Sequence, residues 1–387
     1  MKLPILQESP ATVPSSFEVV RLHEIDLNIT NRCNLDCIHC AFASSIGDAN
    51  ELPYDLVEQI VLDARALGCE DIHLTGGEPT IHREFERILS LIMNSGIFTR
   101  LISNGTMTKE KLRRYRDIGL GHLLFSVDGL DEAHDRIRGQ HGAFRKTIGR
   151  AKDALELGYH LRVNAVAMRD NLHEILPLFE LCEAIGVQLF SVFLYSPTGR
   201  NARRQLDYIV DPHTWRAFKE KLRARALGSR TEVFVEKGFL FRDEPPLDWD
   251  KLPGRGGGCH YLSRVLDYLI ITGDGNVFPC ALLNDKAIPY GNIYQRRLAE
   301  IIRQPEHHYR TYESFREPAG KCNSCGEFNH CHGGCRAFAY AFHQAWDHPD
   351  PQCRREPEQA PEFIPLCPLF KENFKASLVS GFSEKLS

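Results

Sequence analysis

Apolar and polar positions follow two different periods along the first 225 residues of the chain. Runs of alternating or continuous apolar residues predict strands, whereas apolar residues spaced three and four apart predict amphipathic helices. The predicted strands cover residues 24–30, 71–75, 99–104, 122–128, 160–167 and 187–195. The predicted helices cover residues 55–67, 84–94, 109–118, 143–157, 172–185 and 211–227. Strands that alternate with helices at this spacing are typical of a parallel sheet, and six such units predict an α/β fold with a partial (β/α)6 TIM-type barrel.

The pattern changes after the last of these helices. Residues 241–258 are rich in proline and glycine, which marks a boundary, and short strands, turns and cysteines follow. We therefore expect the barrel to be followed by a small cysteine-rich domain that metal sites hold together. The expected division is an N-terminal extension (1–21), the barrel (22–225), a linker (226–254), the cysteine-rich domain (255–370) and a C-terminal tail (371–387).

Composition and charge exclude several classes of protein. The chain is 43% apolar, and 47 Lys and Arg against 51 Asp and Glu leave a net charge of −4. This balance disfavours a broad electrostatic grip on nucleic acid. No apolar run is long enough to span a membrane, and the N-terminus lacks the apolar core of a signal peptide. We expect a cytoplasmic protein.

The cysteines point to metal chemistry. There are 13, an odd number, and eight of them lie between residues 259 and 367. Three more crowd into NRCNLDCIHC as Cys33, Cys37 and Cys40, a C-x3-C-x2-C spacing directly after the first predicted strand. Clustered thiols in a chain without an export signal indicate metal ligands rather than disulfides.

Three thiolates on one loop suit three corners of a [4Fe–4S] cluster and leave its fourth iron without a protein ligand. Such an open iron can bind a substrate or cofactor. The alternative is a zinc site in which His39 stands in for the missing fourth ligand. Zinc sites favour paired C-x2-C units, so the spacing favours the cluster.

C-x3-C-x2-C after the first strand of a (β/α) barrel resembles the radical S-adenosylmethionine (SAM) superfamily, and the resemblance extends through the whole first domain. TGGEPT at residues 75–80 matches that family's GGEP motif, whose backbone receives the SAM amino group. Glycines there let the backbone approach a ligand closely. ISNGT (102–106) and FSVDG (125–129) also fall where family members contact SAM. The SAM contacts that the resemblance implies are Gly76, Gly77, Glu78, Ser103, Asn104, Ser126, Asp128, Arg138 for the carboxylate and Leu194 for adenine.

Two further points concern the expected contacts with adenine, at Phe42 and at Leu194. Family members have an aromatic residue directly after the third cysteine, whereas here Ala41 occupies that place and Phe42 comes next. A backbone contact to adenine tolerates this change, so Phe42 is retained as a cofactor-binding candidate. For Leu194, a place in the apolar core is at least as well supported by the sequence as a contact with adenine.

The C-terminal cysteines resemble the SPASM domain, which carries auxiliary iron–sulfur clusters in one branch of the superfamily. The resemblance covers residues 259–353 and matches seven thiols in order and spacing. It assigns Cys322, Cys325, Cys331 and Cys353 to an outer cluster and Cys259, Cys280 and Cys335 to an inner one. The alternative of two zinc ribbons lacks its second C-x2-C unit. With the SAM cluster, the chain is expected to hold three 4Fe–4S clusters.

The fourth ligand of the inner cluster is left open by the sequence. In sulfatase-activating members of the family this ligand follows shortly after the first SPASM cysteine, but residues 260–270 contain no cysteine here. Cys367 is therefore the candidate for the fourth ligand. The competing interpretations are an open iron that binds substrate, or Cys367 as a hydrogen-atom donor or structural thiol. Cys69 and Cys182 lie among apolar neighbours and are expected to be buried, inert thiols.

The resemblance implies a mechanism. The reduced SAM cluster cleaves SAM to methionine and a 5′-deoxyadenosyl radical, which abstracts hydrogen from an unactivated substrate carbon. The auxiliary clusters would carry an electron away from the substrate radical or ligate the substrate. A one-electron donor of the flavodoxin or ferredoxin type is an expected partner, and no general acid or base is assigned.

The resemblance favours a peptide substrate, because most SPASM enzymes crosslink, oxidise or decarboxylate peptides. About 20 residues precede the first strand, too few for a peptide-recognition domain, so a separate recognition protein is expected. Ala281 stands where sulfatase-activating members have Asp, which argues against formylglycine formation.

Two other substrate classes stay open. PTGRNARR at residues 197–204 resembles a segment of members that act on tetrapyrroles, and Arg200, Arg203 and Arg204 could pair with propionates. A solvated basic turn is the plainer interpretation of that segment. A small molecule such as a sugar is the other class.

A non-catalytic iron–sulfur electron carrier is the alternative from another class of protein. It would need the cysteines but not the GGEP motif, and it would leave SAM intact. A zinc-stabilised binding module would be colourless, whereas an iron–sulfur protein is brown.

Overall fold

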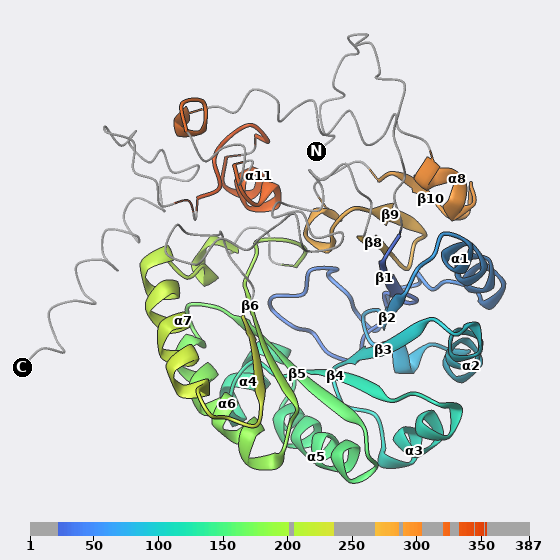
Figure 1. The fold of residues 1–387 in the computed structure, drawn as a ribbon, viewed down its shortest axis with the longest axis horizontal. Helices are drawn as coiled ribbons and strands as arrows, with labels where there is room; N and C mark the ends of the chain where they lie inside the picture. The colour runs from blue at the N-terminus through green and yellow to red at the C-terminus, as the bar shows by residue number, and fades with distance from the viewer. Residues whose placement is uncertain are drawn as a thin grey trace, which may run out of the picture.

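One curved sheet of ten strands runs through the computed structural model, in the order β10-β9-β8-β1-β2-β3-β4-β5-β6-β7 (Figure 1). The structure describes residues 22–200, 205–235, 268–285, 289–303, 320–325, 333–343, 345–351 and 353. Its strands are β1 (Glu24–Asn28), β2 (Asp71–Thr75), β3 (Phe98–Ser103), β4 (His122–Ser126), β5 (His160–Ala167), β6 (Leu189–Leu194), β7 (Glu232–Val235), β8 (Tyr268–Ile271), β9 (Asn276–Phe278) and β10 (Gly291–Asn292).

Helices cover the convex side of this sheet (Figure 1). They are α1 (Tyr54–Ala66), α2 (Phe85–Ser95), α3 (Lys109–Ile118), α4 (Asp131–Arg138), α5 (Ala143–Glu156), α6 (Leu172–Ile185) and α7 (Pro212–Ala226), with α8 (Leu298–Arg303) and α11 (Arg336–His343) in the C-terminal part. Every predicted helix is present within a few residues of its expected ends, whereas α4 was not predicted. Among the described residues no helix is both long and apolar enough to cross a membrane.

Alternation along the strands divides the sheet into a helix-facing side and an inner side. In β1, Ile25 and Leu27 are fully buried in the main core together with Val57 and Ile60 of α1. Burial of each such side chain contributes about 1.5–3 kcal/mol. The residues between them on β1 therefore face the inside of the barrel, which we call the lumen.

The six predicted strands form the centre of the sheet, which the structure extends on both sides. β7 pairs in parallel with β6, and β8, from the cysteine-rich part of the chain, pairs in parallel with β1. β9 and β10 then continue the sheet in antiparallel orientation. The C-terminal part is thus continuous with the barrel sheet, and it lies near the carboxyl ends of the strands, where α/β folds bind ligands.

Candidate active site

The loop that carries Cys33, Cys37 and Cys40 begins directly after β1 and docks against the GGEP segment. The backbone N–H of Gly77 donates to the carbonyl of Thr30 (2.7 Å), and that of Glu78 donates to the carbonyl of Arg32 (2.8 Å). A Cβ on Gly77 would clash with the Arg32 carbonyl. Close approach to the cysteine loop therefore requires glycine here, in addition to any close approach to a ligand.

The other side of the cysteine loop is held by the end of α4. The N–H of Asp36 donates to the carbonyl of Arg138 (3.2 Å), and that of Ile38 donates to the carbonyl of Ile137 (2.9 Å). Gly139 ends α4 with φ of 68°, and a Cβ there would lie 2.7 Å from the Asp36 carbonyl oxygen. The short helix that sequence reasoning missed is thus one of the two walls of the loop.

Each of the three thiols receives an N–H donor. These contacts run from Leu35 N to Cys33 Sγ (3.4 Å), from Arg138 Nη1 to Cys37 Sγ (3.6 Å) and from Ser44 N to Cys40 Sγ (3.4 Å). Burial raises the pKa of Cys33 to about 12 and also raises the pKa of Cys37, against the charge of Arg138. Such thiols ionise only with a positive partner, and N–H donors to sulfur then stabilise the thiolate charge.

The spacing of the thiols tests which metal group fits the loop. Among the described residues, the three sulfur atoms of Cys33, Cys37 and Cys40 do not all lie within 4.8 Å of one another. Tetrahedral zinc holds each sulfur at about 2.3 Å, which requires closer sulfurs. His39 does not complete a zinc site through Nε2, because that atom lies 3.1 Å from Asp128 Oδ2. The donor set fits a multi-iron cluster better than a single ion.

Asp128, two residues after β4, is fully buried between Arg138 and His39. Its Oδ2 lies 2.7 Å from Arg138 Nη2 and 3.1 Å from His39 Nε2, and its Oδ1 accepts the Val166 N–H. Burial acts to raise the pKa of Asp128, but the charges of Arg138 and His39 outweigh it and lower the pKa. Two SAM-contact candidates, Asp128 and Arg138, therefore bind each other, and the buried Arg138 Nε has no acceptor.

Glu78 connects the ends of β2 and β3. Its carboxylate accepts from Ser103 Oγ (2.9 Å), from the Asn104 N–H (2.8 Å) and from Thr80. Burial raises the pKa of Glu78 in spite of these bonds. The Asn104 side chain donates to Asn34 (2.9 Å) and lies 4.0 Å from Cys33 Sγ. Glu78 and Ser103 thus fix the loop ends, so a SAM contact here would come from the backbone.

The remaining SAM-contact candidates occupy varied environments. Ser126 is half-buried at the end of β4, on its inner face, and Phe42 is half-buried in the cysteine loop. Leu194 belongs to the main apolar core. The structure therefore places Leu194 in the core, and its contact with adenine stays a prediction.

The PTGR segment holds the cysteine loop to the C-terminal part of the chain. The N–H of Arg200 donates to the Cys40 carbonyl (2.9 Å), and its guanidinium contacts Asp36 and the Ser44 carbonyl. A Cβ on Gly199 would clash with the Cys40 carbonyl. Arg200 is thus committed to the loop rather than free for a propionate, and Arg203 and Arg204 lie outside the described residues.

Asp285, five residues after Cys280, completes this connection. Its carboxylate accepts from Thr198 Oγ1 (2.7 Å) and from the Gly199 N–H (2.9 Å). The neighbouring Asn284 side chain donates to the Ala41 carbonyl (3.1 Å). Sequence reasoning missed Asp285, because no local pattern signals a partner more than eighty residues away.

The described C-terminal cysteines fall into two neighbourhoods. Cys280 and Cys335 pack against the same small apolar cluster, formed by Leu283 and Ala337. Lys321, next to Cys322, donates to the Cys353 carbonyl (2.9 Å). Asp350 lies between the two neighbourhoods and accepts the N–H groups of Cys335 and Cys353. Cys259, Cys331 and Cys367 lie outside the described residues.

Several inner-face side chains that sequence reasoning did not select carry polar atoms without a partner. Both amide atoms of Asn28, the Oγ of Ser191 and the Oδ1 of Asn164 are buried and make no hydrogen bond. In the register of the sheet, Asn164 lies between Ser126 and Ser191. Polar residues within predicted strands were the available signal for this lumen surface.

Two family models match this chain. The model described as the radical SAM superfamily matches residues 27–182, and the SPASM model, described as an iron–sulfur cluster-binding domain, matches residues 259–326.

Curated relatives and a solved structure are also similar. The AdoMet-dependent heme synthase of Methanosarcina barkeri is 28% identical over 85% of this chain and 95% of the relative. The PqqA peptide cyclase of Bradyrhizobium diazoefficiens is 26% identical over 86% of each. The structure of Streptococcus suis SuiB bound to S-adenosylmethionine superposes with a TM-score of 0.72, at 21% identity, over 86% of this chain and 77% of that chain. The last likeness concerns the fold alone.

Proposed function

We propose that this chain, which belongs to the radical SAM superfamily and carries a C-terminal SPASM domain, cleaves SAM reductively and uses the 5′-deoxyadenosyl radical to take a hydrogen atom from a substrate carbon. The observation that carries the proposal is the cysteine loop. Its three thiols lie on one short loop directly after β1, and each accepts an N–H donor.

The residues around the loop would position the cluster and exclude water. Arg138 places a positive charge beside Cys37, which offsets part of the negative charge of a thiolate-bound cluster. Asp128 holds that guanidinium in place. Glu78 fixes the GGEP turn, whose backbone is proposed to bind the SAM amino group.

Three clusters are proposed. Cys33, Cys37 and Cys40 would hold the SAM cluster, and the seven SPASM cysteines with Cys367 would hold the two auxiliary clusters. The shared neighbourhood of Cys280 and Cys335 supports the inner assignment, and the contact between the Cys322 and Cys353 segments supports the outer one.

We propose a tetrapyrrole-type cofactor precursor as the first substrate class. The heme synthase relatives support it, since the Methanosarcina barkeri enzyme aligns over 95% of its own length. A peptide, the class first expected from the sequence, is the second candidate, and the PqqA peptide cyclases support it. An electron donor of the flavodoxin or ferredoxin type would supply the reducing electron. A separate recognition protein is proposed as a further partner only for the peptide.

The test is anaerobic incubation of the reconstituted protein with SAM and dithionite, followed by mass spectrometry. We expect 5′-deoxyadenosine and methionine to form in equal amounts. Cys37→Ala should abolish both products, and the matched control Cys69→Ala, a buried thiol hydrogen-bonded to the Asp71 carbonyl, should retain them. Intact SAM in the wild-type reaction would identify an electron carrier instead.

A further inference from the structure

The lumen below the candidate SAM site is lined by charged side chains. In β5, Leu161 and Val163 belong to the helix-facing core, so Arg162 and Asn164 face inward. Arg162 pairs in register with Leu124 of β4, and Asn164 pairs with Ser126, a SAM-contact candidate. Arg162 thus lies one inward position, about 7 Å, deeper in the barrel than Asn164.

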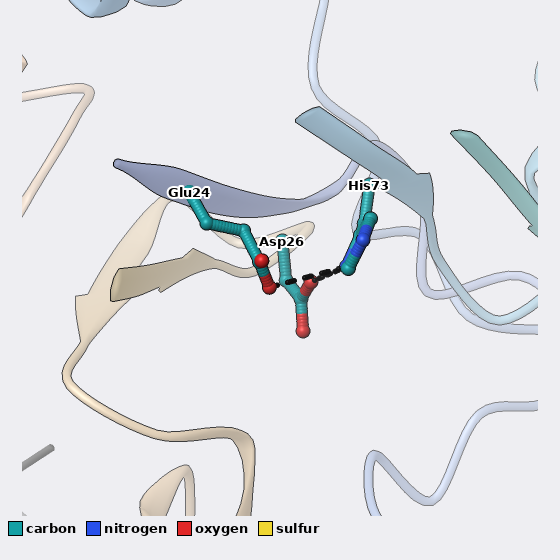
Figure 2. Close-up of side chains that lie close together, drawn as sticks. All are labelled: Glu24, Asp26 and His73. Atoms are coloured by element: carbon teal, nitrogen blue, oxygen red, sulfur yellow. Dashed lines mark hydrogen bonds and ion pairs between the residues drawn. The ribbon is translucent and has the colours of Figure 1, made fainter. Parts of the chain in front are cut away.

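The β1 to β3 side of the lumen is internally paired. Figure 2 shows Glu24, Asp26 and His73 converging, with His73 Nδ1 2.8 Å from Asp26 and 3.4 Å from Glu24. Arg100 donates to His73 Nε2 (2.7 Å) and pairs with Asp71 (2.7 Å). Because His73 and Arg100 already hold hydrogen bonds or ion pairs with these carboxylates, the group resembles a closed wall more than a cation site.

Arg162 differs from Arg100 in having no such partner. Its side chain makes no hydrogen bond or ion pair with any part of the chain that the structure describes, and its Nε is buried without an acceptor. The rings of Phe193 and Phe234 lie with their centroids 5.6 and 5.4 Å from its guanidinium carbon. Burial, with repulsion from Arg100, lowers the pKa of Arg162 to about 10, and attraction by Glu24 acts in the opposite direction.

Arg162 is half-buried, and its buried Nε, which has no acceptor among the described residues, is costly unless a ligand completes its hydrogen bonds. Contacts with aromatic rings restrict the orientation of its plane and leave N–H groups at its edge for a bidentate acceptor. Phe234 lies on β7, the end strand of the described sheet, and is 41% exposed. The exposed ring of Phe234 therefore offers an apolar surface that a planar substrate with an acidic group could contact beside Arg162.

We propose that Arg162 binds a carboxylate of the substrate inside the barrel, with Phe193 and Phe234 packing against the adjoining apolar part. This inference rests on the proposed function and narrows its substrate class to molecules that present a carboxylate. The carboxylate could belong to a tetrapyrrole side chain or to an acidic residue of a peptide, and one guanidinium would recognise either.

The test measures equilibrium binding to the anaerobically reconstituted full chain. The tetrapyrrole arm compares protoporphyrin IX with its dimethyl ester. The peptide arm compares acetyl-Gly-Glu-Gly-amide with acetyl-Gly-Gln-Gly-amide. In one arm we expect the acid to bind roughly ten- to hundredfold more tightly than its neutral counterpart, and that arm identifies the source of the carboxylate.

Variants of the protein then test whether Arg162 causes the tighter binding of the acid. Arg162→Gln should remove the advantage of the acid, and Arg162→Lys, which keeps the charge without the fork, should reduce it severalfold. Arg114→Gln, a surface arginine of α3 paired with Glu86, should keep the full advantage. An equal affinity for acid and neutral probes in both arms, or an advantage that survives in Arg162→Gln, would overturn the proposal. If Arg162→Gln does not fold, the wild-type comparison and Arg162→Lys still decide. No turnover is needed, so a failure of SAM cleavage would count against the proposed function alone.

Discussion

Arg138 and Asp128 form a buried ion pair in which Nη2 of the guanidinium lies 2.7 Å from Oδ2 of the carboxylate. Nη1 of the same arginine lies 3.6 Å from the Cys37 sulfur. The Arg138 side chain therefore connects Asp128, just after β4, to Cys37 in the cysteine loop. Its positive charge acts on both the Asp128 carboxylate and the Cys37 sulfur.

Arg138→Gln should destabilise the protein by about 3 to 5 kcal/mol, because it removes the larger of the two attractive charges beside the buried Asp128. Urea unfolding measures this loss. The double variant Arg138→Gln/Asp128→Asn should recover part of it, since both charges are then gone. Equal losses in the single and double variants would show that the pair is not the cause.

Stability should fall as the pH drops from 6.5 to 5 because of His134. Burial, with the charge of Arg138, lowers the pKa of His134 to about 4, and its Nδ1 accepts the Asp128 N–H. Below pH 6.5 the unfolded chain binds a proton that the folded chain refuses, at a cost of about 1.4 kcal/mol per pH unit.

Unfolding experiments at pH 7 and pH 5 measure this slope. In His134→Gln, the difference in free energy of unfolding between pH 7 and pH 5 should be smaller by about 2 kcal/mol. Asp128 has a lowered pKa, so its contribution is lost only as the pH falls below the ordinary carboxyl range. An unchanged slope in His134→Gln would contradict the assignment.

Gly77→Ala should displace the cysteine loop, because its Cβ would meet the Arg32 carbonyl. We expect a destabilisation of about 1 to 3 kcal/mol and a loss of iron from the reconstituted protein. Gly149→Ala is the matched control, since Gly149 lies in α5 with open space around it and alanine favours a helix. Normal iron content in Gly77→Ala would refute the close docking of the two loops.

Asp285→Asn should loosen the PTGR segment, because the carboxylate loses strength as an acceptor from Thr198 and Gly199. With that segment displaced from Cys40, we expect the SAM cluster to bleach severalfold faster in air. Loss of visible absorbance measures the rate. Asp274→Asn, in the turn between β8 and β9, is the control, and equal rates in both variants would contradict the connection.

Much of the barrel was predictable from the sequence because its signals are local. Glycines such as Gly158 end amphipathic helices, and Cys33, Cys37 and Cys40 lie on one short loop. α4 was missed because it is short and strongly polar. The pairing of β8 with β1 depends on partners more than two hundred residues apart, which no local pattern records.

In the site as well, local sequence signals were readable, whereas contacts between distant residues were not. The sequence offered two interpretations of Arg200, a solvated basic turn and a partner for a substrate propionate, whereas in the fold it contacts Asp36 and Ser44. Arg162 looked like an ordinary strand residue, and only the register of β5 shows that it faces the lumen, where its Nε finds no acceptor among the residues that the structure describes.

The most direct test of the central claim is electron paramagnetic resonance of the dithionite-reduced protein with and without SAM. We expect SAM to change the signal of the cluster held by Cys33, Cys37 and Cys40, because SAM binds its open iron. The change should be absent in Cys40→Ala, in which only auxiliary clusters remain. A wild-type spectrum that SAM leaves unchanged would contradict the account.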